Sequence, residues 1–283
     1  MSTLSWFITG TSSGFGRALT EQLLARGDRV FATLRKTAAL DDLKSRYENT
    51  LAVAQLDVTD TAAIRRVVKE AFERFGKIDV VINNAGFGVA GAAEEATDEQ
   101  IRRQIDTNVI GSVQVTRAAL PYLRAQGGGR ILQLSSMGGQ LSFPGLSFYH
   151  LSKWAIEGFY EAVIPEIAPF NIQVTLIEPG VAPTGFGGEN LSRTPVMAVY
   201  EPTPVGDFRR SVAAGAFSTT GDAGKMVAAM IDSVSIHPAP KRLALGSDAF
   251  DMIGAALVGR LADLYNQKAM ALSTDRVPRT DPF

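Results

Sequence analysis

Short apolar runs alternate along the chain with segments whose apolar residues recur every three or four positions. The short runs lack polar alternation, which is typical of strands buried on both faces of a parallel sheet. They comprise residues 4–9, 29–34, 51–56, 78–82, 130–134 and 172–177, with a shorter seventh at 243–245. The helical segments comprise residues 15–26, 62–75, 98–124 and 148–168. Several of them end at a glycine, as helices commonly do.

Strands that are separated repeatedly by helices predict right-handed βαβ units. We therefore expect an α/β, doubly wound, mainly parallel sheet of seven strands with helices on both faces. Residues 1–180 contain no linker and no change in composition. The sequence thus predicts a single domain over residues 1–283.

The stretch 181–221 departs from this pattern because it is rich in proline and glycine. Loops of this length within compact domains are usually lids or disordered segments. The stretch also contains apolar side chains, namely Phe186, Met197, Tyr200, Phe208 and Phe217. Those side chains favour a lid that folds onto a binding site, which we call the lid segment.

A last helix is predicted over residues 248–272. Its apolar residues Phe250, Ile253, Leu257, Leu261 and Leu264 mark one face. This helix is a candidate either for capping a substrate site or for altering the assembly. Residues 273–283 have no periodicity, and we expect them to be loose.

The bulk composition removes several kinds of site. The chain has 283 residues, 46% of them apolar, and a formal net charge of -1, which gives no general attraction to nucleic acid or to anionic membranes. It contains no cysteine and two histidines, so disulfides, thiolate nucleophiles and multi-histidine metal sites are not expected. No signal peptide and no apolar run of about 20 residues is present, so we expect a cytoplasmic protein that has no membrane span and binds neither nucleic acid nor metal.

A glycine-rich turn follows the first predicted strand and opens the first predicted helix. It reads Thr9-Gly10-Thr11-Ser12-Ser13-Gly14-Phe15-Gly16. Backbone N–H groups at such a turn point at whatever lies above it, and a dinucleotide pyrophosphate suits that position. The same letters match G-x-S-x-G, the nucleophile turn of α/β-hydrolases, but that turn needs an oxyanion loop from an earlier strand, and no earlier strand exists.

The end of the second strand bears on which dinucleotide would bind. NAD-binding proteins usually place an acidic residue about 20 positions after the glycine turn, to hold the ribose 2′-hydroxyl. Here the residues are Arg35 and Lys36, which favour the 2′-phosphate of NADP over NAD. The alternative is a solvated pair of charges. Asp57 and Val58, which end the third strand, are candidates for the adenine amino group, unless Asp57 caps the next helix.

Tyr149 and Lys153 lie four residues apart and share one face of a predicted helix. A tyrosine phenol has a pKa near ~10 and is a poor acid–base group at neutral pH. A nearby ammonium favours the phenolate and lowers that pKa. Alone, such a pair is a common surface pairing.

Landmarks in order along residues 4–185 resemble the classical short-chain dehydrogenase/reductase family, whose fold is of the Rossmann type. They are the turn from Thr9 to Gly16, Asp57, Asn83-Asn84-Ala85-Gly86, Asn108, Ser136, the Tyr149-x-x-x-Lys153 pair, Pro179-Gly180 and Thr184. One departure is that His150 and Leu151 follow the tyrosine, and we interpret His150 as a packing or interface residue. A second departure is Pro183, in a position that is often basic or polar.

The resemblance implies a role for each catalytic position. Tyr149 would be the acid in carbonyl reduction and the base in alcohol oxidation, and Ser136 would bind the carbonyl oxygen, with Ser135 as the neighbouring candidate. Lys153 would bind the nicotinamide ribose and lower the pKa of the tyrosine. Asn108 would hold a helix geometry and a water in a proton relay, and Thr184 would help to fix the carboxamide.

The remaining expectations concern cofactor, substrate and assembly. The expected cofactor-binding residues are Gly10, Thr11, Ser12, Ser13, Gly14, Phe15, Gly16, Arg35, Asp57, Val58, Asn84, Ala85, Gly86, Tyr149, Lys153, Pro179, Gly180 and Thr184. Expected pocket walls are apolar, namely Phe87, Leu141, Phe143, Phe186 and Tyr200, and they favour a fairly hydrophobic ketone, aldehyde or alcohol. The resemblance implies homodimers or homotetramers, in part through helices 98–124 and 148–168.

Alternatives to an NADP(H)-dependent carbonyl reductase remain. They are an NAD-dependent alcohol dehydrogenase, a cofactor-binding regulatory or scaffold protein without turnover, and an epimerase or dehydratase on the same fold. Epimerases and dehydratases usually have a differently spaced glycine turn and a larger C-terminal domain. The intact Ser136, Tyr149 and Lys153 argue against a protein without turnover.

Overall fold

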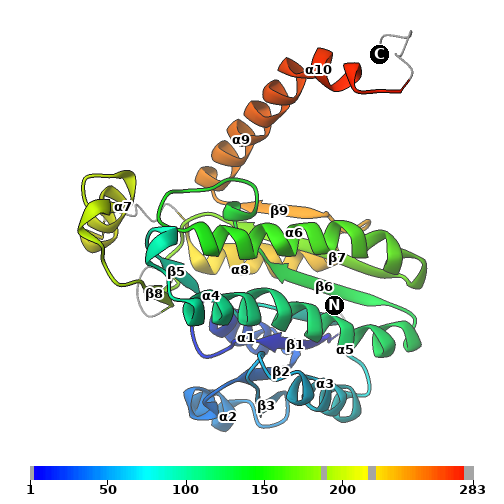
Figure 1. Cartoon of the computed structure of the whole chain (residues 1–283). Helices are drawn as coiled ribbons and strands as arrows, with labels where there is room; N and C mark the ends of the chain where they lie inside the picture. Colours follow the sequence, from blue (N-terminus) through cyan, green and yellow to red (C-terminus); the bar gives the residue numbers. More distant parts are fainter. Residues whose placement is uncertain (1–2, 186–189, 216–220, 277–283) are drawn as a thin grey trace.

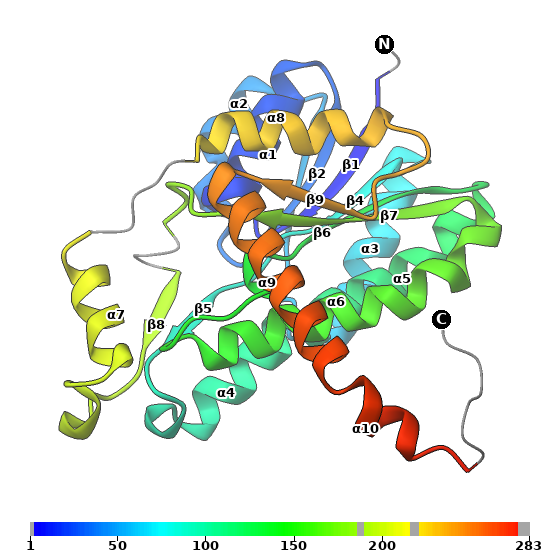
Figure 2. The same ribbon diagram turned by 90° about the horizontal axis from the view of Figure 1, so that it is seen from above.

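The computed structural model describes residues 3–185, 190–215 and 221–276. These residues form a seven-stranded sheet in which every ladder is parallel, with strand order β3-β2-β1-β4-β6-β7-β9. Helices cover both faces of the sheet (Figure 1, Figure 2). The predicted doubly wound fold with seven parallel strands is therefore confirmed.

The strands and helices have the following bounds. The sheet consists of β1 (Ser5–Thr9), β2 (Arg29–Leu34), β3 (Leu51–Gln55), β4 (Val80–Asn83), β6 (Gly129–Leu134), β7 (Ile172–Pro179) and β9 (Arg242–Leu245). A separate pair of strands consists of β5 (Gly88–Ala90) and β8 (Leu191–Arg193). The α-helices are α1 (Gly14–Ala25), α2 (Asp41–Arg46), α3 (Thr61–Phe75), α4 (Asp98–Ile105), α5 (Ser112–Ala125), α6 (Ser147–Ile167), α7 (Pro204–Ala213), α8 (Ala223–Asp232), α9 (Ser247–Asn266) and α10 (Lys268–Ser273).

Two apolar layers hold the helices on the sheet. On one face α3, α5 and α6 pack against residues such as Phe7 and Phe31. On the other face α1 and α8 pack against Trp6 and Ile8, which are the neighbours of Phe7 on the same strand. All five residues of β1 are buried, because a central parallel strand is covered on both sides. The uninterrupted apolar runs in the sequence reflect this double burial.

The segment predicted as one helix over residues 98–124 is divided in the structure. A turn of π-helix at Asp106–Gly111 separates α4 from α5. Gly111, at the end of this turn, packs against the loop between β3 and α3. A Cβ on Gly111 would lie only 2.9 Å from the carbonyl oxygen of Val58 in that loop. The extra residue in the turn is invisible to hydrophobic spacing, and such π-bulges often occur at functional sites.

The lid segment has more regular structure than the sequence indicated. It contains β8, which pairs in parallel with β5, and it contains α7, which lies outside the sheet (Figure 2). Phe186 and Phe217, two of the apolar residues assigned to the lid, lie outside the described residues.

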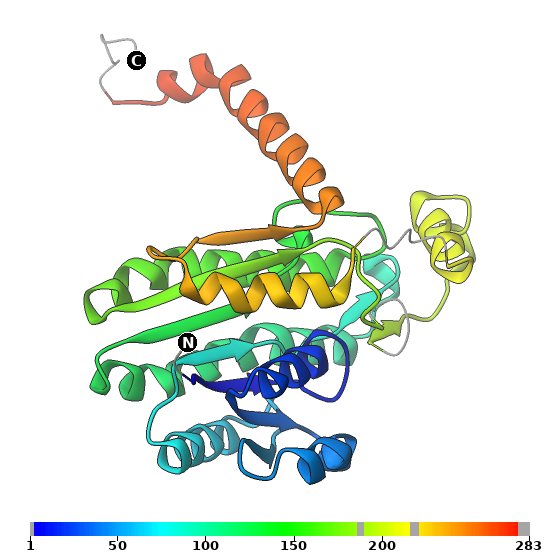
Figure 3. The same cartoon turned by 180° about the vertical axis from the view of Figure 1, so that it is seen from behind.

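The predicted C-terminal helix is present as α9 and α10, and it extends away from the body of the molecule (Figure 1, Figure 3). Of the apolar face predicted for it, Ile253 is buried, whereas Phe250, Leu257, Leu261 and Leu264 are exposed. Among the described residues, no helix combines the length and the apolar character needed to cross a membrane.

Candidate active site

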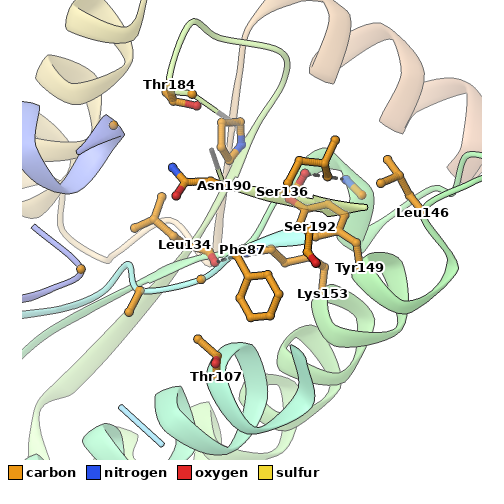
Figure 4. Close-up of a pocket in the computed structure, with 18 of the residues that line it drawn as sticks. Phe87, Thr107, Leu134, Ser136, Leu146, Tyr149, Lys153, Thr184, Asn190 and Ser192 are labelled. Atoms are coloured by element: carbon orange, nitrogen blue, oxygen red, sulfur yellow. Dashed lines mark hydrogen bonds between the residues drawn. The ribbon is translucent and has the colours of Figure 1, made fainter. Parts of the chain in front are cut away.

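A cavity of about 1880 Å³ lies along the carboxyl ends of the parallel strands. It runs from the turn after β1 to the lid segment and the first turn of α9. In folds of this kind the strand order reverses beside the first strand, and ligands bind in the crevice formed there. Figure 4 shows part of its lining, with Ser136, Tyr149 and Lys153 on one wall and Thr184, Asn190 and Ser192 from the lid segment.

The structure brings Ser136, Tyr149 and Lys153 together at the cavity. Ser136 follows β6, while Tyr149 lies in the first turn of α6 and Lys153 one turn later. The Lys153 ammonium donates a hydrogen bond of 2.8 Å to the carbonyl oxygen of Leu134 and lies 5.5 Å from the centre of the Tyr149 ring. The three side chains that the sequence singled out therefore face one space.

Burial dominates the electrostatics of this group. It raises the pKa of Tyr149 to about 12, although a hydrogen bond with Ser136 acts in the opposite direction. Burial also lowers the pKa of Lys153 to about 8, which the carboxylate of Glu157 partly opposes. Tyr149 is consequently a protonated phenol at neutral pH, with the hydroxyl of Ser136 as its hydrogen-bond partner. Of the two candidate serines, Ser136 is therefore the one that contacts Tyr149.

Asn108 lies in the π-turn, and its amide is occupied by protein groups. Its Nδ2 donates to the carbonyl oxygen of Phe87 at 2.8 Å and to Ser152 Oγ at 3.1 Å, while Oδ1 accepts from the Phe87 N–H at 3.1 Å. Asn108 therefore joins the segment after β4 to α6. Holding this geometry is the part of its implied role that the structure shows; the water relay stays a prediction.

His150 is buried, and each ring nitrogen has a backbone partner. The N–H of Phe143 donates to Nε2 at 2.9 Å, so Nε2 carries no proton. Nδ1 must then carry it, and it donates to the carbonyl oxygen of Gly138 at 2.9 Å. Burial lowers the pKa of His150, which keeps this neutral form. Of the two interpretations offered for His150, packing is the one that the structure shows.

The glycine turn fits a phosphate-bearing ligand. Gly10 has a φ of +71°, and a Cβ there would lie 2.7 Å from Ala85 Cα. The cap residue Ser13 makes no side-chain hydrogen bond to the first turn of α1, and that turn contains no acidic residue. The backbone N–H groups at the start of α1 are therefore left for an anion in the adjoining cavity.

The far end of the cavity is lined by Arg35 and Asp57. Burial tends to raise the pKa of Asp57, but hydrogen bonds from Thr59 and the charge of Arg35 outweigh it and hold the pKa below its usual 3.8. Asp57 does not cap α3, because Asp60 is its N-cap. Arg17, the basic residue of α1, does not provide a second cation for this end of the cavity, because it pairs with Glu21 and Asp42.

The lid segment is fastened to the body by a buried carboxylate. Glu95 accepts hydrogen bonds from the N–H groups of Ala92 at 2.7 Å and Met197 at 2.8 Å, and it pairs with Arg209 of α7. Burial favours a raised pKa for Glu95, but these partners outweigh it and lower the pKa. Phe208, beside Arg209, lies in the cavity wall near Tyr149.

A second buried cluster lies behind the serine wall. Glu157 of α6 and Glu178 of β7 share Arg242 of β9, with nitrogen–oxygen distances of 3.0 and 3.2 Å. Gln140 donates to both carboxylates, at 3.2 and 2.9 Å. Burial and the neighbouring Glu157 raise the pKa of Glu178 to about 7. The cluster thus carries a proton within the neutral range.

The structure distributes the expected cofactor residues between the cavity and its support. Those that line the cavity are Gly10, Ser12, Ser13, Gly14, Phe15, Arg35, Asp57, Val58, Asn84, Ala85, Gly86, Tyr149, Lys153, Pro179, Gly180 and Thr184. Thr11 and Gly16 lie behind it: Thr11 donates to the carbonyl oxygen of Thr33 at 3.2 Å, and Gly16 packs on Gly10 and Asn84.

The expected pocket walls divide in the same way. Phe87 and Phe143 line the cavity. Leu141 instead packs beside Ala249 and Ile253, and Tyr200 donates to Glu94 at 2.7 Å. Phe186 lies outside the described residues. Leu141 and Tyr200 do not line the cavity because their side chains contact α9 and Glu94, contacts that the sequence pattern could not predict.

Sequence reasoning missed lining residues that come from the lid segment and α9. These are Asn190, Ser192, Val212, Asp248 and Met252. A polar residue next to apolar ones in a proline- and glycine-rich stretch would have been the available signal for Asn190 and Ser192. For Asp248, the signal was an acidic residue in the first turn of a helix.

The comparisons with known proteins agree with this geometry. The family model described as short chain dehydrogenase matches residues 5–194. Oxidoreductase BOA17 of Botryotinia fuckeliana is 39% identical over 253 residues, which cover 89% of this chain and 92% of that protein. The 3-ketodihydrosphingosine reductase of Bacteroides thetaiotaomicron is 41% identical over 181 residues, or 63% of this chain and 64% of that one.

The fold comparison leads to the same group. A short-chain dehydrogenase from Streptomyces avermitilis superposes with a TM-score of 0.90 at 39% identity, covering 97% of this chain and 100% of that one. The matched region includes the glycine turn, Ser136, Tyr149 and Lys153. The chain therefore belongs to the short-chain dehydrogenase/reductase family of oxidoreductases.

Proposed function

We propose that the protein is an NADP(H)-dependent oxidoreductase that reduces the carbonyl group of a hydrophobic ketone or aldehyde to an alcohol. The observation that carries the proposal is the convergence of Ser136, Tyr149 and Lys153 on one cavity that also reaches the glycine turn and Arg35. The bound cofactor supplies a hydride for the carbonyl carbon. Tyr149 transfers its phenolic proton to the carbonyl oxygen, so that the product is a neutral alcohol.

The protonation state of Tyr149 suits a proton donor. Because the pKa of Tyr149 is raised to about 12, the phenol holds its proton at neutral pH and can act as the acid. Ser136 Oγ accepts a hydrogen bond from the Gly138 N–H at 3.0 Å, which leaves its own O–H to donate to the carbonyl oxygen or to Tyr149. Lys153, with a pKa of about 8, adds positive charge that stabilises the phenolate left after proton transfer.

The cofactor assignment depends on the end of β2. Arg35 is exposed at the cavity, and the acid that would hold a free 2′-hydroxyl is missing at this position. A guanidinium binds a phosphate through charge-assisted hydrogen bonds, which a 2′-hydroxyl cannot match. These features support NADP(H) over NAD(H).

The substrate assignment depends on the opposite end of the cavity. Phe87, Phe143, Leu146, Phe208 and Met252 give it an apolar wall. Such a wall suits a hydrocarbon chain next to the reacting carbonyl, because burying apolar surface is favourable. The Bacteroides relative named 3-ketodihydrosphingosine reductase supports a ketone on a long apolar chain as the class to test first.

The decisive experiment replaces the proposed acid. In Tyr149→Phe the ring remains but the proton is lost, so we expect the rate of NADPH-dependent carbonyl reduction to fall by roughly 10²-fold to 10⁴-fold. NADPH affinity, measured by fluorescence titration, should change little. Phe159→Tyr on the same helix serves as a folding control. Near-normal turnover of Tyr149→Phe with any accepted carbonyl compound would refute the assigned role.

A second variant tests the cofactor. Removing the charged side chain in Arg35→Ala should weaken NADPH binding by about 10-fold to 100-fold, the loss expected for one charge-assisted contact of roughly 1.5–3 kcal/mol. NADH binding should be nearly unchanged. Equal loss for both dinucleotides would show that Arg35 does not bind the 2′-phosphate. Arg29→Ala would be a poor control because Arg29 contacts Ser5 and Phe75, so Arg65→Ala on the surface of α3 is preferable.

A further inference from the structure

The projecting helix α9 exposes an unusual amount of apolar surface. Its first two turns are anchored through the buried Ala249 and Ile253. Farther along, Arg260 lies over the ring of Trp154 of α6, 4.8 Å from its centre. Four apolar side chains of α9 are nevertheless exposed: Phe250 by 73%, Leu257 by 50%, Leu261 by 53% and Leu264 by 60%. The described residues leave half or more of each of these four residues uncovered.

Some of the exposed residues recur at a regular spacing, beside the equally exposed Val258 and Tyr265. Positions at alternating spacings of four and three residues lie on one side of a helix and are the pattern of a two-helix coiled coil. Along α9 and into α10 they are Phe250, Gly254, Leu257, Leu261, Leu264 and Lys268. We call this set the α9 seam. A seam of this kind requires another helix as its partner.

We propose that the α9 seam pairs with the same seam of a second copy of this chain, with the two helices antiparallel. In this register, Leu257 lies opposite Leu261 of the second copy, and Gly254 opposite Leu264. Phe250 then lies opposite Lys268. Because the pair has a twofold axis, each of these layers occurs twice.

Size and charge both favour this partner. Gly254 has no atom within 4 Å of the position that a Cβ would occupy, and the antiparallel register fills this gap with a leucine. The same register brings the start of α10 of the second copy, with the cation Lys268, toward the end of α9 that carries Phe250 and the exposed Asp251. A parallel pair would instead place Gly254 against Gly254 and Lys268 against Lys268. The seam is therefore complementary to itself only in the antiparallel sense.

The first experiment measures the mass of the full-length protein by light scattering during gel filtration. The seam variant Leu257→Glu/Leu261→Glu places four glutamates at the centre of the pair, so we expect its mass to be half that of the wild type. The control Ala255→Glu/Ala262→Glu adds the same charges to exposed positions of α9 outside the seam and should keep the wild-type mass. Circular dichroism checks that all three proteins are folded.

Three results would overturn the proposal. They are a monomeric wild type, a seam variant that keeps the wild-type mass, and a control variant that dissociates as readily as the seam variant. The first would leave a different protein or a lipid surface as the occupant of the seam. Since enzymatic turnover is not measured, the outcome is independent of the proposed reductase activity.

A second experiment tests the register. The chain has no cysteine, so an introduced pair can be read without interference. We expect Leu257→Cys and Leu261→Cys proteins, mixed and allowed to exchange subunits before oxidation, to give a disulfide-linked dimer that contains one of each. Ala255→Cys mixed with Ala262→Cys should give none. Cross-linking of Leu257→Cys mainly to itself would indicate parallel helices and would overturn the antiparallel arrangement.

Discussion

At the scale of single residues, His150 connects the proposed acid to the loop that carries Ser136. Its two backbone contacts, to Gly138 and Phe143, fix both sides of that loop. The N–H of Gly138 in turn donates to Ser136 Oγ. Tyr149 and the serine it contacts are thus held in register by the residue that follows Tyr149 in the chain. Because both ring nitrogens of His150 are taken by backbone groups, its effect is one of positioning.

If His150 positions the loop after β6, variants that keep or lose its hydrogen bonds should differ in turnover. His150→Phe keeps a ring but loses both hydrogen bonds, each contributing about 1 kcal/mol, so we expect turnover to fall by roughly 10-fold while NADPH affinity is retained. His150→Asn restores the donor to Gly138 and should recover most of the rate. Steady-state kinetics and NADPH titration measure both effects. His237→Phe, at the other and exposed histidine, is the control.

If His150→Asn turns over no faster than His150→Phe, the hydrogen bond to Gly138 does not contribute to turnover.

The sequence identified Tyr149, Lys153 and Ser136 because their spacing is local or matches a known order. It did not identify the partners of His150, since both are backbone groups whose position depends on how the loop after β6 folds back. Helical spacing predicts that His150 points away from the face that carries Tyr149, but it does not predict which groups His150 contacts.

At the scale of elements, the cluster of Glu157, Glu178 and Arg242 joins α6, β7 and β9. A carboxyl group whose pKa is raised by folding contributes most stability when it is protonated. For Glu178 this contribution is full below the ordinary pKa of 4.5 and is lost as the pH rises through about 7. The wild type should therefore lose stability across this interval because of Glu178.

Replacing Glu178 by the neutral isostere removes that dependence. We expect Glu178→Gln to melt several degrees above the wild type at pH 8, a gain of roughly 3 kcal/mol, and to show much less difference at pH 4.5. Glu161→Gln is a control of opposite sign, because Lys241 and Arg242 lower the pKa of Glu161. Thermal unfolding followed by circular dichroism at the two pH values decides the matter. If the melting temperatures of Glu178→Gln and the wild type differed by the same amount at both pH values, the raised pKa of Glu178 would be contradicted.

The elements themselves were predictable to different degrees. Strands such as β2, at residues 29–34, were predicted at the observed bounds, since a buried parallel strand has an unmistakable apolar run. The π-turn at Asp106–Gly111 was not, because one extra residue per turn barely changes hydrophobic spacing. The helix α7 was hidden by the prolines and glycines around it, although Thr203 and Pro204 are a typical helix start.

At the scale of the whole molecule, the lid segment and the first turns of α9 border the cavity from outside the sheet. The sequence could predict that both exist but not where they lie. Lid residues reach the body through Glu95, whose partners Met197 and Arg209 are more than 100 positions away in the chain. The apolar residues predicted for one face of α9 divide in the structure, because Ile253 is buried whereas Phe250, Leu257, Leu261 and Leu264 are exposed. Amphipathic spacing does not tell whether a helix packs on its own chain or on another.

The position of β9 at the sheet edge has a consequence for synthesis of the chain. β9 pairs with β7, and residues 242–245 emerge from the ribosome more than 60 positions after β7 is complete. Until then the edge of β7 presents unpaired backbone groups beside apolar surface, a state that is prone to aggregate. Because every ladder of the sheet is parallel, no local hairpin can protect this edge earlier. A released chain that ends before β9 should therefore aggregate more readily than the full chain, as light scattering during refolding would measure.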